Sequence, residues 1–219
     1  MSELMIDALA GVSLFAGLKR AELAPLAAAT VPRGHPAHAI IVREGDRAES
    51  LQIVLSGQIK VFVSGDDGRE VVLTTMGPGS YFGEMMLDDE LRSASIMTLE
   101  PCRVAVVSRD VFRDFLAHHP DASLALIRNL IGRIRAMNER FRDLALLDAY
   151  GRVSKLLQSV ARDAGGYRVV DGLTQQDIGD RVGASREMIN RVIKELEADG
   201  HIRREGRRIV ILRAPPPGR

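Results

Sequence analysis

The sequence predicts an α+β protein, with an N-terminal β-roll of the jelly-roll kind and its flanking helices, a long helix, and a C-terminal winged helix-turn-helix. Between Thr30 and Arg109, short β-rich runs alternate with glycine-containing turns at intervals of roughly 8–12 residues, a spacing typical of all-β sandwiches and rolls. Between Arg109 and about Asp148, apolar residues follow a heptad pattern, which predicts a long helix that pairs with a second helix. The stretch 173–202 holds two short amphipathic helical patterns around a glycine, which is the arrangement of a helix-turn-helix.

The first 30 residues carry apolar side chains at helical spacing. Gly11 and Gly17 interrupt them, so we expect short helices rather than one long helix. Six strand-like runs follow: HAIIV, SLQIVL, QIKVFVS, EVVLTTM, SASIMTL and CRVAVVS. The run Asp66-Asp67-Gly68 between two of them predicts a hairpin turn. We therefore expect residues 1–118 to form the roll domain.

One turn of the predicted roll differs from the others. Residues 81–87 leave the strand pattern for a short helical turn, and Arg92 and Ser93 follow at the head of the next strand. Helix amide groups beside a guanidinium suit an anion, whereas the Glu84 carboxylate suits the hydroxyls of a ribose. Spacing alone favours a plainer interpretation, in which Arg92 pairs at the surface with Asp88 or Asp89.

A helical stretch runs from Arg109 to about Asp148, with a break expected near His119-Pro120. Its heptad positions predict a seam against a second copy of the chain, so we expect residues 119–148 to be a dimerisation helix. Asn138 lies inside this seam and has two interpretations: it fixes the register of a two-stranded coiled coil, or it meets the base edge of a ligand at the dimer axis. The seam positions are Leu124, Ile127, Ile131, Ile134, Asn138, Phe141 and Ala145.

Residues 149–219 are expected to form a DNA-binding domain, in which Ala149 to Gly166 has a helical pattern. Thr174 and Asp177 predict a capping box at the first helix of the motif, Gly183 a tight turn, and Ser185 the N-cap of the second helix. Apolar residues of the second helix recur at helical spacing and should face inward; they are Ile189, Val192, Ile193 and Leu196.

The outer face of the second helix is polar. Its plain interpretation is a solvated surface on which Glu187 and Arg191, four residues apart, form an ion pair. The capped helices, the tight turn and the polar residues at the start of the helix together favour the major groove of DNA. The segment 202–211 predicts a two-stranded wing turning at Glu205-Gly206, whose four arginines either contact phosphates or keep an exposed edge soluble. The final APPPGR is expected to be disordered.

Charge and cysteine content narrow the possible functions. The net charge is +1, but the segment from Asp148 onward has 14 Lys and Arg against 10 Asp and Glu, while the rest has 16 against 19. A basic C-terminal third fits a nucleic-acid partner. Cys102 is the single cysteine, which excludes an internal disulfide and a four-cysteine iron–sulfur site, so we expect it in the core. No run approaches 18 apolar residues and no signal-like start is present, so we expect no membrane segment and a cytoplasmic location.

Four motifs, in this order, resemble a known family. They are REGD with LSGQIKV, then FGEMMLDDELRSAS, then the seam helix ending LALLDAYGRV, and finally LTQQDIGDRVGASREMINRVIKELEADGHI, and they span nearly the whole chain. On these motifs the chain resembles bacterial transcription regulators of the cyclic-AMP receptor protein and fumarate/nitrate reduction regulator superfamily, nearest the cyclic-AMP receptor branch. The resemblance implies a homodimeric regulator, not an enzyme, that binds double-stranded DNA and contacts RNA polymerase.

That branch recognises DNA with an Arg-Glu-x-x-x-Arg pattern, which Arg186, Glu187 and Arg191 match. The resemblance implies arginine bonds to guanine edges and a glutamate bond to a cytosine amino group, on an inverted repeat of TGTGA-like half-sites. The expected DNA-contacting residues are Thr174, Gln175, Ser185, Arg186, Glu187, Asn190 and Arg191.

The same branch binds a cyclic nucleotide through Gly-Glu and Arg-Ser pairs. Their match here implies that Arg92 and Ser93 hold the cyclic phosphate and that Glu84 accepts from the ribose 2′-hydroxyl, which reverses the surface pairing favoured by spacing. The expected ligand-contacting residues are Gly83, Glu84, Met85, Arg92, Ser93, Met137 and Asn138.

Two departures from that branch bear on the effector. The interval between Glu84 and Arg92 is somewhat shorter than in the enteric-type receptor. Met137 and Asn138 stand where that receptor presents a threonine-serine pair to adenine, and a methionine makes no useful hydrogen bond to a base edge. Cyclic AMP is the expected effector, with cyclic GMP, cyclic di-GMP or no nucleotide effector as alternatives.

An enzyme and a metal site are not expected. A small β-roll can hold a metal through histidine and carboxylate clusters, but His35 and His38 have no obvious further ligands in the strands. No pairing of a nucleophile with a base is visible either.

Overall fold

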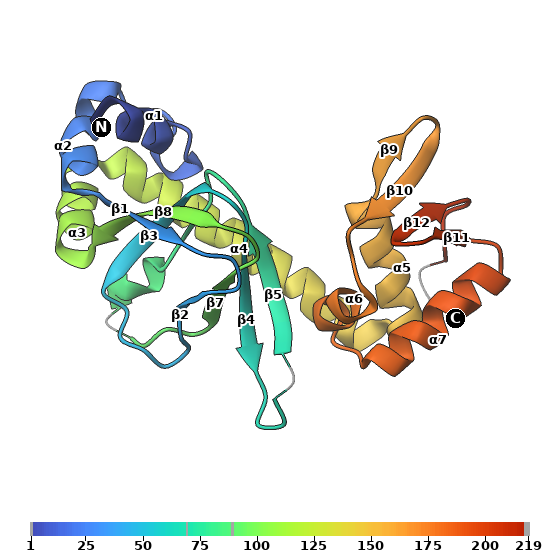
Figure 1. Cartoon of the computed structure of the whole chain (residues 1–219). Helices are drawn as coiled ribbons and strands as arrows, with labels where there is room; N and C mark the ends of the chain where they lie inside the picture. The colour runs from blue at the N-terminus through green and yellow to red at the C-terminus, as the bar shows by residue number, and fades with distance from the viewer. Residues whose placement is uncertain (1, 69, 89, 217–219) are drawn as a thin grey trace. The chain divides into compact units, whose positions relative to one another are not determined.

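The computed structural model of the chain describes residues 2–68, 70–88 and 90–216. The chain divides into two compact units, Met1–Arg133 and Ile134–Arg219. The long helix α4 (Pro120–Leu146) begins in the first unit and ends in the second (Figure 1).

Two four-stranded antiparallel sheets form the roll of the first unit, with strand orders β1-β8-β3-β6 and β2-β7-β4-β5. The first sheet consists of β1 (Val31–His35), β3 (Ser50–Ser56), β6 (Tyr81–Phe82) and β8 (Cys102–Ser108). The second consists of β2 (Ile40–Val42), β4 (Ile59–Ser64), β5 (Glu70–Met76) and β7 (Ser95–Thr98). The eight strands confirm the predicted roll. The predicted hairpin turn is also confirmed, because the Gly68 amide donates to the Gly65 carbonyl over 2.9 Å between β4 and β5.

Two of the eight strands were not predicted. β1 contains Pro32 and Gly34, both of which disfavour strands, and it lies at a sheet edge, where a proline is tolerated because its missing amide faces solvent. β6 is only two residues long. Both strands depend on partners far away in sequence, since β1 pairs with β8 and β6 with β3.

Helices cover one end of the roll (Figure 1). The expected short N-terminal helices are present as α1 (Ser2–Ala10), the 3-10 turn η1 (Ser13–Phe15) and α2 (Arg20–Ala29). The predicted break before Pro120 is also present, between α3 (Arg109–His118) and α4. Proline is favoured at the first position of a helix because the amide that it lacks would have no partner there.

Two buried apolar clusters hold the first unit together. The larger joins the helices to strands β3 and β8 and includes Leu23, Leu51 and Phe112, each fully buried. The smaller lies between the sheets and includes Phe82 and Cys102. Cys102 is only 2% exposed, which confirms its prediction as a core residue.

The second unit contains the end of α4, then α5 (Ala149–Val160), the hairpin β9 (Arg162–Ala164) and β10 (Tyr167–Asp171), α6 (Gln175–Val182) and α7 (Arg186–Ala198). The wing strands β11 (Ile202–Glu205) and β12 (Arg208–Ile211) follow, and the sheet has the order β11-β12-β10-β9. The wing was predicted, although its two-residue turn is Gly206-Arg207, one position later than expected.

Two predictions for this unit were wrong. The helix expected to reach Gly166 ends at Val160, because the chain reverses at Gly165-Gly166 and β10 pairs with β12, about 40 residues onward. The tail was expected to be disordered, but Pro215 is buried and its carbonyl accepts a hydrogen bond of 3.0 Å from Gln158 Nε2 on α5. Residues 217–219 lie outside the described part.

Candidate ligand pocket and DNA interface

Gly83 lies where β6 leads into the 3-10 turn η2 (Glu84–Asp88). Its φ of +87° is in the left-handed region that favours glycine. A Cβ at this position would lie 2.5 Å from the Ser50 carbonyl oxygen and closer still to the Arg92 guanidinium. Only a glycine therefore lets the arginine approach the backbone of β3 and of this turn.

Arg92 is held by its backbone as well as by its side chain. Its amide donates to the Asp46 carbonyl over 2.8 Å, and its own carbonyl accepts from the Gly45 amide over 2.9 Å. Its Nη2 donates to the Ser50 carbonyl over 2.9 Å. The REGD segment, which contains Gly45 and Asp46, thus positions the arginine of the RSAS segment.

The Arg92 guanidinium is half-buried, and among the described residues it forms no ion pair. Burial lowers the pKa of Arg92, and the negative charges of Glu84 and Asp46 oppose that shift. The surface ion pair with Asp88 is not formed, and Asp89 lies outside the described residues. A desolvated cation without a direct carboxylate partner favours an anion.

Glu84 is buried, with its side chain 10% exposed, and Arg133 on α4 is its partner. Arg133 Nη1 donates to Glu84 Oε1 over 2.8 Å, and Nη2 donates to the Tyr81 carbonyl over 2.9 Å. The guanidinium also lies 4.8 Å from the centre of the Tyr81 ring. The other carboxylate oxygen, Oε2, is buried and accepts no hydrogen bond from the described residues.

Sequence reasoning missed Arg133. No local signal marks it, because the residue lies 49 positions from Glu84 and next to the seam position Ile134. Its role depends on α4 passing over η2 and β6, which the sequence pattern does not specify.

The remaining expected ligand residues are exposed. Ser93 Oγ donates to Met85 Sδ over 3.2 Å, so these two side chains lie together beside Arg92. Met137, which is 62% exposed, and Asn138 lie on the part of α4 that belongs to the second unit. The structure thus brings together five of the expected ligand residues: Gly83, Glu84, Met85, Arg92 and Ser93.

The seam positions of α4 are exposed in the single chain. Ile127 is 51% exposed, Ile134 52% and Phe141 74%. Isolated apolar residues at a surface are ordinary, but a row of apolar residues along one helix face, here interrupted only by Asn138 among the seam positions, is typical of an interaction surface.

The helix-turn-helix has the predicted caps. The Thr174 hydroxyl accepts from the Asp177 amide over 3.1 Å, and the Thr174 amide donates to the Asp177 carboxylate over 2.7 Å. Gly183 has a φ of +66°, and the Ser185 hydroxyl accepts from the Met188 amide over 3.2 Å. These contacts confirm the capping box, the glycine turn and the second N-cap.

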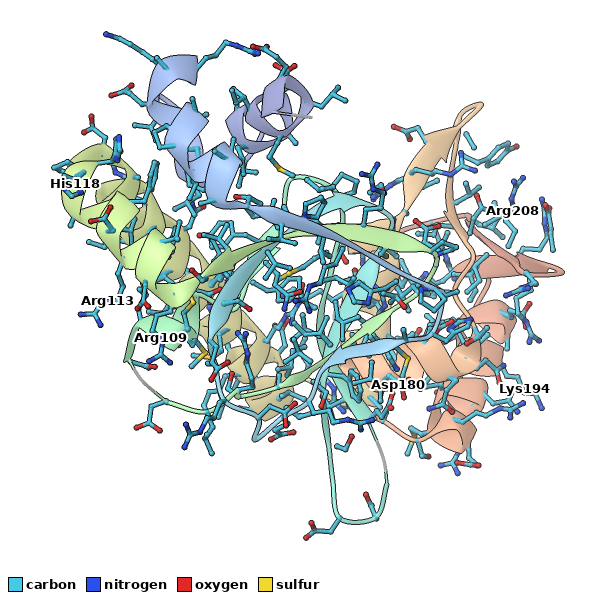
Figure 2. All side chains as sticks on the ribbon, turned by 60° about the vertical axis from the view of Figure 1, so that its left-hand side comes forward. Arg109, Arg113, His118, Asp180, Lys194 and Arg208 are labelled. Atoms are coloured by element: carbon cyan, nitrogen blue, oxygen red, sulfur yellow. The ribbon has the colours of Figure 1, made fainter. Side chains whose placement is uncertain are left out.

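Helix α7 presents the predicted faces. Ile189, Val192, Ile193 and Leu196 are all at most 3% exposed, whereas Arg186, Glu187 and Arg191 are exposed. Hydrogen bonds from its own backbone amide and from the Ser185 hydroxyl lower the pKa of Glu187, so this carboxylate is charged at neutral pH. Figure 2 shows Lys194 further along the same helix, with its side chain in solvent.

The four wing arginines differ in their partners. Arg203 is paired with Glu205, Arg204 with Glu197, and Arg208, labelled in Figure 2, with Asp171. No ion pair involves Arg207 among the described residues. Arg207 instead lines a shallow cleft of about 170 Å³ that is also lined by Thr174 and Gln175 at the start of α6.

Within the described residues there is no group of three or more His, Cys, Asp or Glu side chains placed to hold a metal ion. No helix in the same part of the chain is long and apolar enough to cross a membrane.

A β-roll with a buried Glu84 and a half-buried Arg92, joined by a long helix to a winged helix-turn-helix, is the architecture of a ligand-binding transcription regulator. The model of the cyclic nucleotide-binding domain matches residues 32–119, and that of the Crp-like helix-turn-helix domain matches residues 151–215. The chain is 35% identical over 213 residues to a CRP-like cAMP-activated global transcriptional regulator of Mycobacterium tuberculosis, covering 94% of this chain and 95% of that one.

Solved structures of such regulators match the chain over most of its length. The cyclic di-GMP-responsive global regulator CLP of Xanthomonas campestris matches with a TM-score of 0.77 at 27% identity, covering 88% of this chain and 99% of that one. The catabolite activator protein of Thermus thermophilus matches with a TM-score of 0.57 at 27% identity, covering 92% and 94%. The chain therefore belongs to the cyclic-AMP receptor protein and fumarate/nitrate reduction regulator superfamily, and it is a cyclic nucleotide-binding, DNA-binding regulator of transcription.

Proposed function

We propose that the chain works as a cytoplasmic homodimer whose affinity for an inverted-repeat DNA site is controlled by a cyclic nucleotide bound beside Arg92 and Glu84. The single observation that carries this proposal is the buried Glu84 Oε2, which accepts no hydrogen bond from the described residues. A buried acceptor without a donor costs roughly 1–3 kcal/mol, and a ligand hydroxyl would remove that cost.

The two charges of the pocket suit different parts of one ligand. Arg92, half-buried and without an ion pair among the described residues, would hold the phosphate together with Ser93. Glu84 would keep Arg133 on Oε1 and accept the ribose 2′-hydroxyl on Oε2. A carboxylate placed against the phosphate itself would repel it, so this division follows from charge.

Cyclic AMP is the effector that we propose, because the relative of 35% identity is described as cAMP-activated. Cyclic di-GMP is the alternative, because the CLP structure is described as responsive to it. Cyclic GMP is a third candidate. We propose that Met137 and Asn138 face the base of the nucleotide. Of the two, only Asn138 has a side chain that can hydrogen-bond to a base edge.

The exposed apolar row on α4 would form the dimer interface, since it follows the heptad spacing of a two-stranded coiled coil. In that dimer two α7 helices would enter successive major grooves of TGTGA-like half-sites. Arg186 and Arg191 would bond guanine edges, and Glu187 a cytosine amino group. Thr174, Gln175 and Ser185 would contact the sugar-phosphate backbone of the DNA next to these bases. RNA polymerase is the further partner that we propose.

Control by the ligand requires that it bind the DNA-competent state more tightly than the other state, because a ligand with equal affinity for both shifts nothing. Reciprocity then requires DNA to tighten ligand binding by the same factor. The test is calorimetric titration of the protein with cyclic AMP, cyclic GMP and cyclic di-GMP, each repeated with a TGTGA-type inverted-repeat duplex present. One nucleotide is expected to bind, and to bind about 5- to 150-fold more tightly with the duplex.

Two variants separate the halves of the proposal. Arg92→Ala should abolish nucleotide binding and leave the urea unfolding transition cooperative. Arg191→Ala should leave nucleotide binding intact and cost about 1–3 kcal/mol at one guanine position. Nucleotide binding by Arg92→Ala at parental affinity, or DNA affinity that is indifferent to all three nucleotides, would contradict the proposal.

A further inference from the structure

Two carboxamides connect the helices of the helix-turn-helix. Gln175, the first residue of α6, donates from Nε2 to Oδ1 of Asn190 in the second turn of α7, over 3.3 Å. Both side chains are half-buried. α6 and α7 are fixed to each other by the buried Ile178 and Ile189, so the first residue of one helix holds a side chain of the other in a set orientation.

Asn190 lies next to the residues proposed to contact bases. It is four positions after Arg186 and three after Glu187, and residues at these spacings are neighbours on a helix surface. A carboxamide normally offers a donor and an acceptor at once, which is why asparagine can bond adenine at both N6 and N7. Here Oδ1 is turned toward Gln175 on α6, and no described residue accepts a hydrogen bond from Nδ2, so the side chain offers its two Nδ2 hydrogens to another partner.

We propose that Gln175 makes Asn190 a donor-only contact to the DNA and thereby gives each half-site one additional position of base preference. This inference rests on the proposed function, since it requires α7 to lie in the major groove. Gln175 is the positioning residue, and Asn190 is the residue that touches the base.

The acceptor atoms that each base presents in the major groove determine which bases the Asn190 amino group can contact. Guanine offers N7 and O6 as acceptors, thymine offers O4, and adenine offers N7 beside an amino group that Asn190 could no longer satisfy. Cytosine presents only its N4 amino donor, so a donor facing it is left unpaired. At one position on the contacted strand the protein should therefore prefer guanine or thymine and disfavour cytosine.

The experiment is selection of binding sites from a duplex library that keeps one TGTGA-type half-site constant and randomises the other with its flanking bases, at saturating effector. Asn190→Ala should lose the preference at one position, by about 2- to 10-fold, which is the range expected for a single hydrogen bond. That position identifies the contact.

Gln175→Glu is the decisive variant. A carboxylate at this position can only accept, so Asn190 must donate to it and present Oδ1 to the DNA instead. The preference at the identified position should then change to cytosine or adenine, whose amino groups are donors. The added negative charge weakens binding to all sequences alike, so it cancels when bases are compared at one position. Gln175→Met is the matched control, and it should relax the preference without reversing it.

The possible outcomes separate this inference from the function on which it rests. If the parent protein selects the half-site and Arg191→Ala relaxes one guanine, but Gln175→Glu keeps the parental preference at every position, the inference is overturned and the proposed function stands. If the parent selects no inverted repeat with any of the three nucleotides, the proposed function fails and the inference fails with it. A reversal of preference with Gln175→Glu, absent with Gln175→Met, supports the donor-only contact, because loss of packing alone would not change which base is preferred.

Discussion

Arg133 Nη1 donates to Glu84 Oε1 over 2.8 Å and so joins α4 to the turn that carries the proposed ribose contact. The carboxylate is 10% exposed and the guanidinium 38% exposed, so the pair is buried on one side and open to water on the other. This contact lies one residue before the seam position Ile134. A ligand that bonds to Glu84 would therefore act first on a residue of the helix proposed to form the dimer.

Arg133→Gln should destabilise the protein and weaken nucleotide binding. The variant leaves the Glu84 carboxylate buried without its cation, and about 1 kcal/mol of stability should be lost after allowing for solvent screening of the exposed arginine. Urea unfolding and nucleotide titration measure the two effects. Arg135→Gln, at an exposed position two residues onward on the same helix, is the control and should behave as the parent. Equal behaviour of both variants would contradict the role assigned to Arg133.

Gly83→Ala should disrupt the pocket by steric overlap. The new Cβ would overlap the Ser50 carbonyl and the Arg92 guanidinium, so nucleotide binding should be lost along with stability. Gly68→Ala is the matched control, since Gly68 has a φ of +76° and no atom within 4 Å of a Cβ built there. It should cost only the backbone strain, about 1–2 kcal/mol, and keep nucleotide binding. The prediction fails if calorimetry finds equal nucleotide affinity in the two variants.

Arg207 should be the wing arginine that neutralises a DNA phosphate. It lies in the cleft beside Thr174 and Gln175, whereas Arg203 is paired with Glu205. Arg207→Gln should reduce the slope of log affinity against log salt concentration by about 1, uniformly across DNA sequences. Arg203→Gln should change this slope less, because its positive charge is already offset by a carboxylate. A larger change with Arg203→Gln would reverse the assignment.

Phe141→Asp should convert the dimer to a monomer. Phe141 is 74% exposed in the single chain and lies on the heptad seam, where a charge would be buried against the partner helix. Sedimentation velocity should give the mass of one chain, and affinity for the inverted repeat should fall because the second half-site contact is lost. Leu4→Asp, at a 77% exposed residue of α1 outside the seam, is the control and should remain dimeric. A monomeric parent protein would show that the seam has another use.

Much of the fold was predictable because its signals are local. Thr174 and Asp177 cap α6, Gly183 takes the left-handed conformation, and Pro120 begins α4, each through bonds or sterics within a few residues. Predictions failed where distant pairing overrode local pattern. β1 forms despite Pro32 because β8 pairs with it, and the helix expected to reach Gly166 gives way to a hairpin because β12 pairs with β10.

The sequence by itself determined the class of the protein, the order of its parts, and the choice of Glu84, Arg92, Arg186 and Arg191 as candidate site residues. Tertiary structure alone decided what surrounds them. It directed Arg92 to the Ser50 carbonyl, placed Arg133 on Glu84, and left Asn190 bonded to Gln175. The physical reason is the separation along the chain over which each interaction acts. Capping and turn preferences act over three or four residues, whereas these hydrogen bonds join residues 15 to 49 positions apart. They form only because the burial of apolar side chains brings the elements that carry them together.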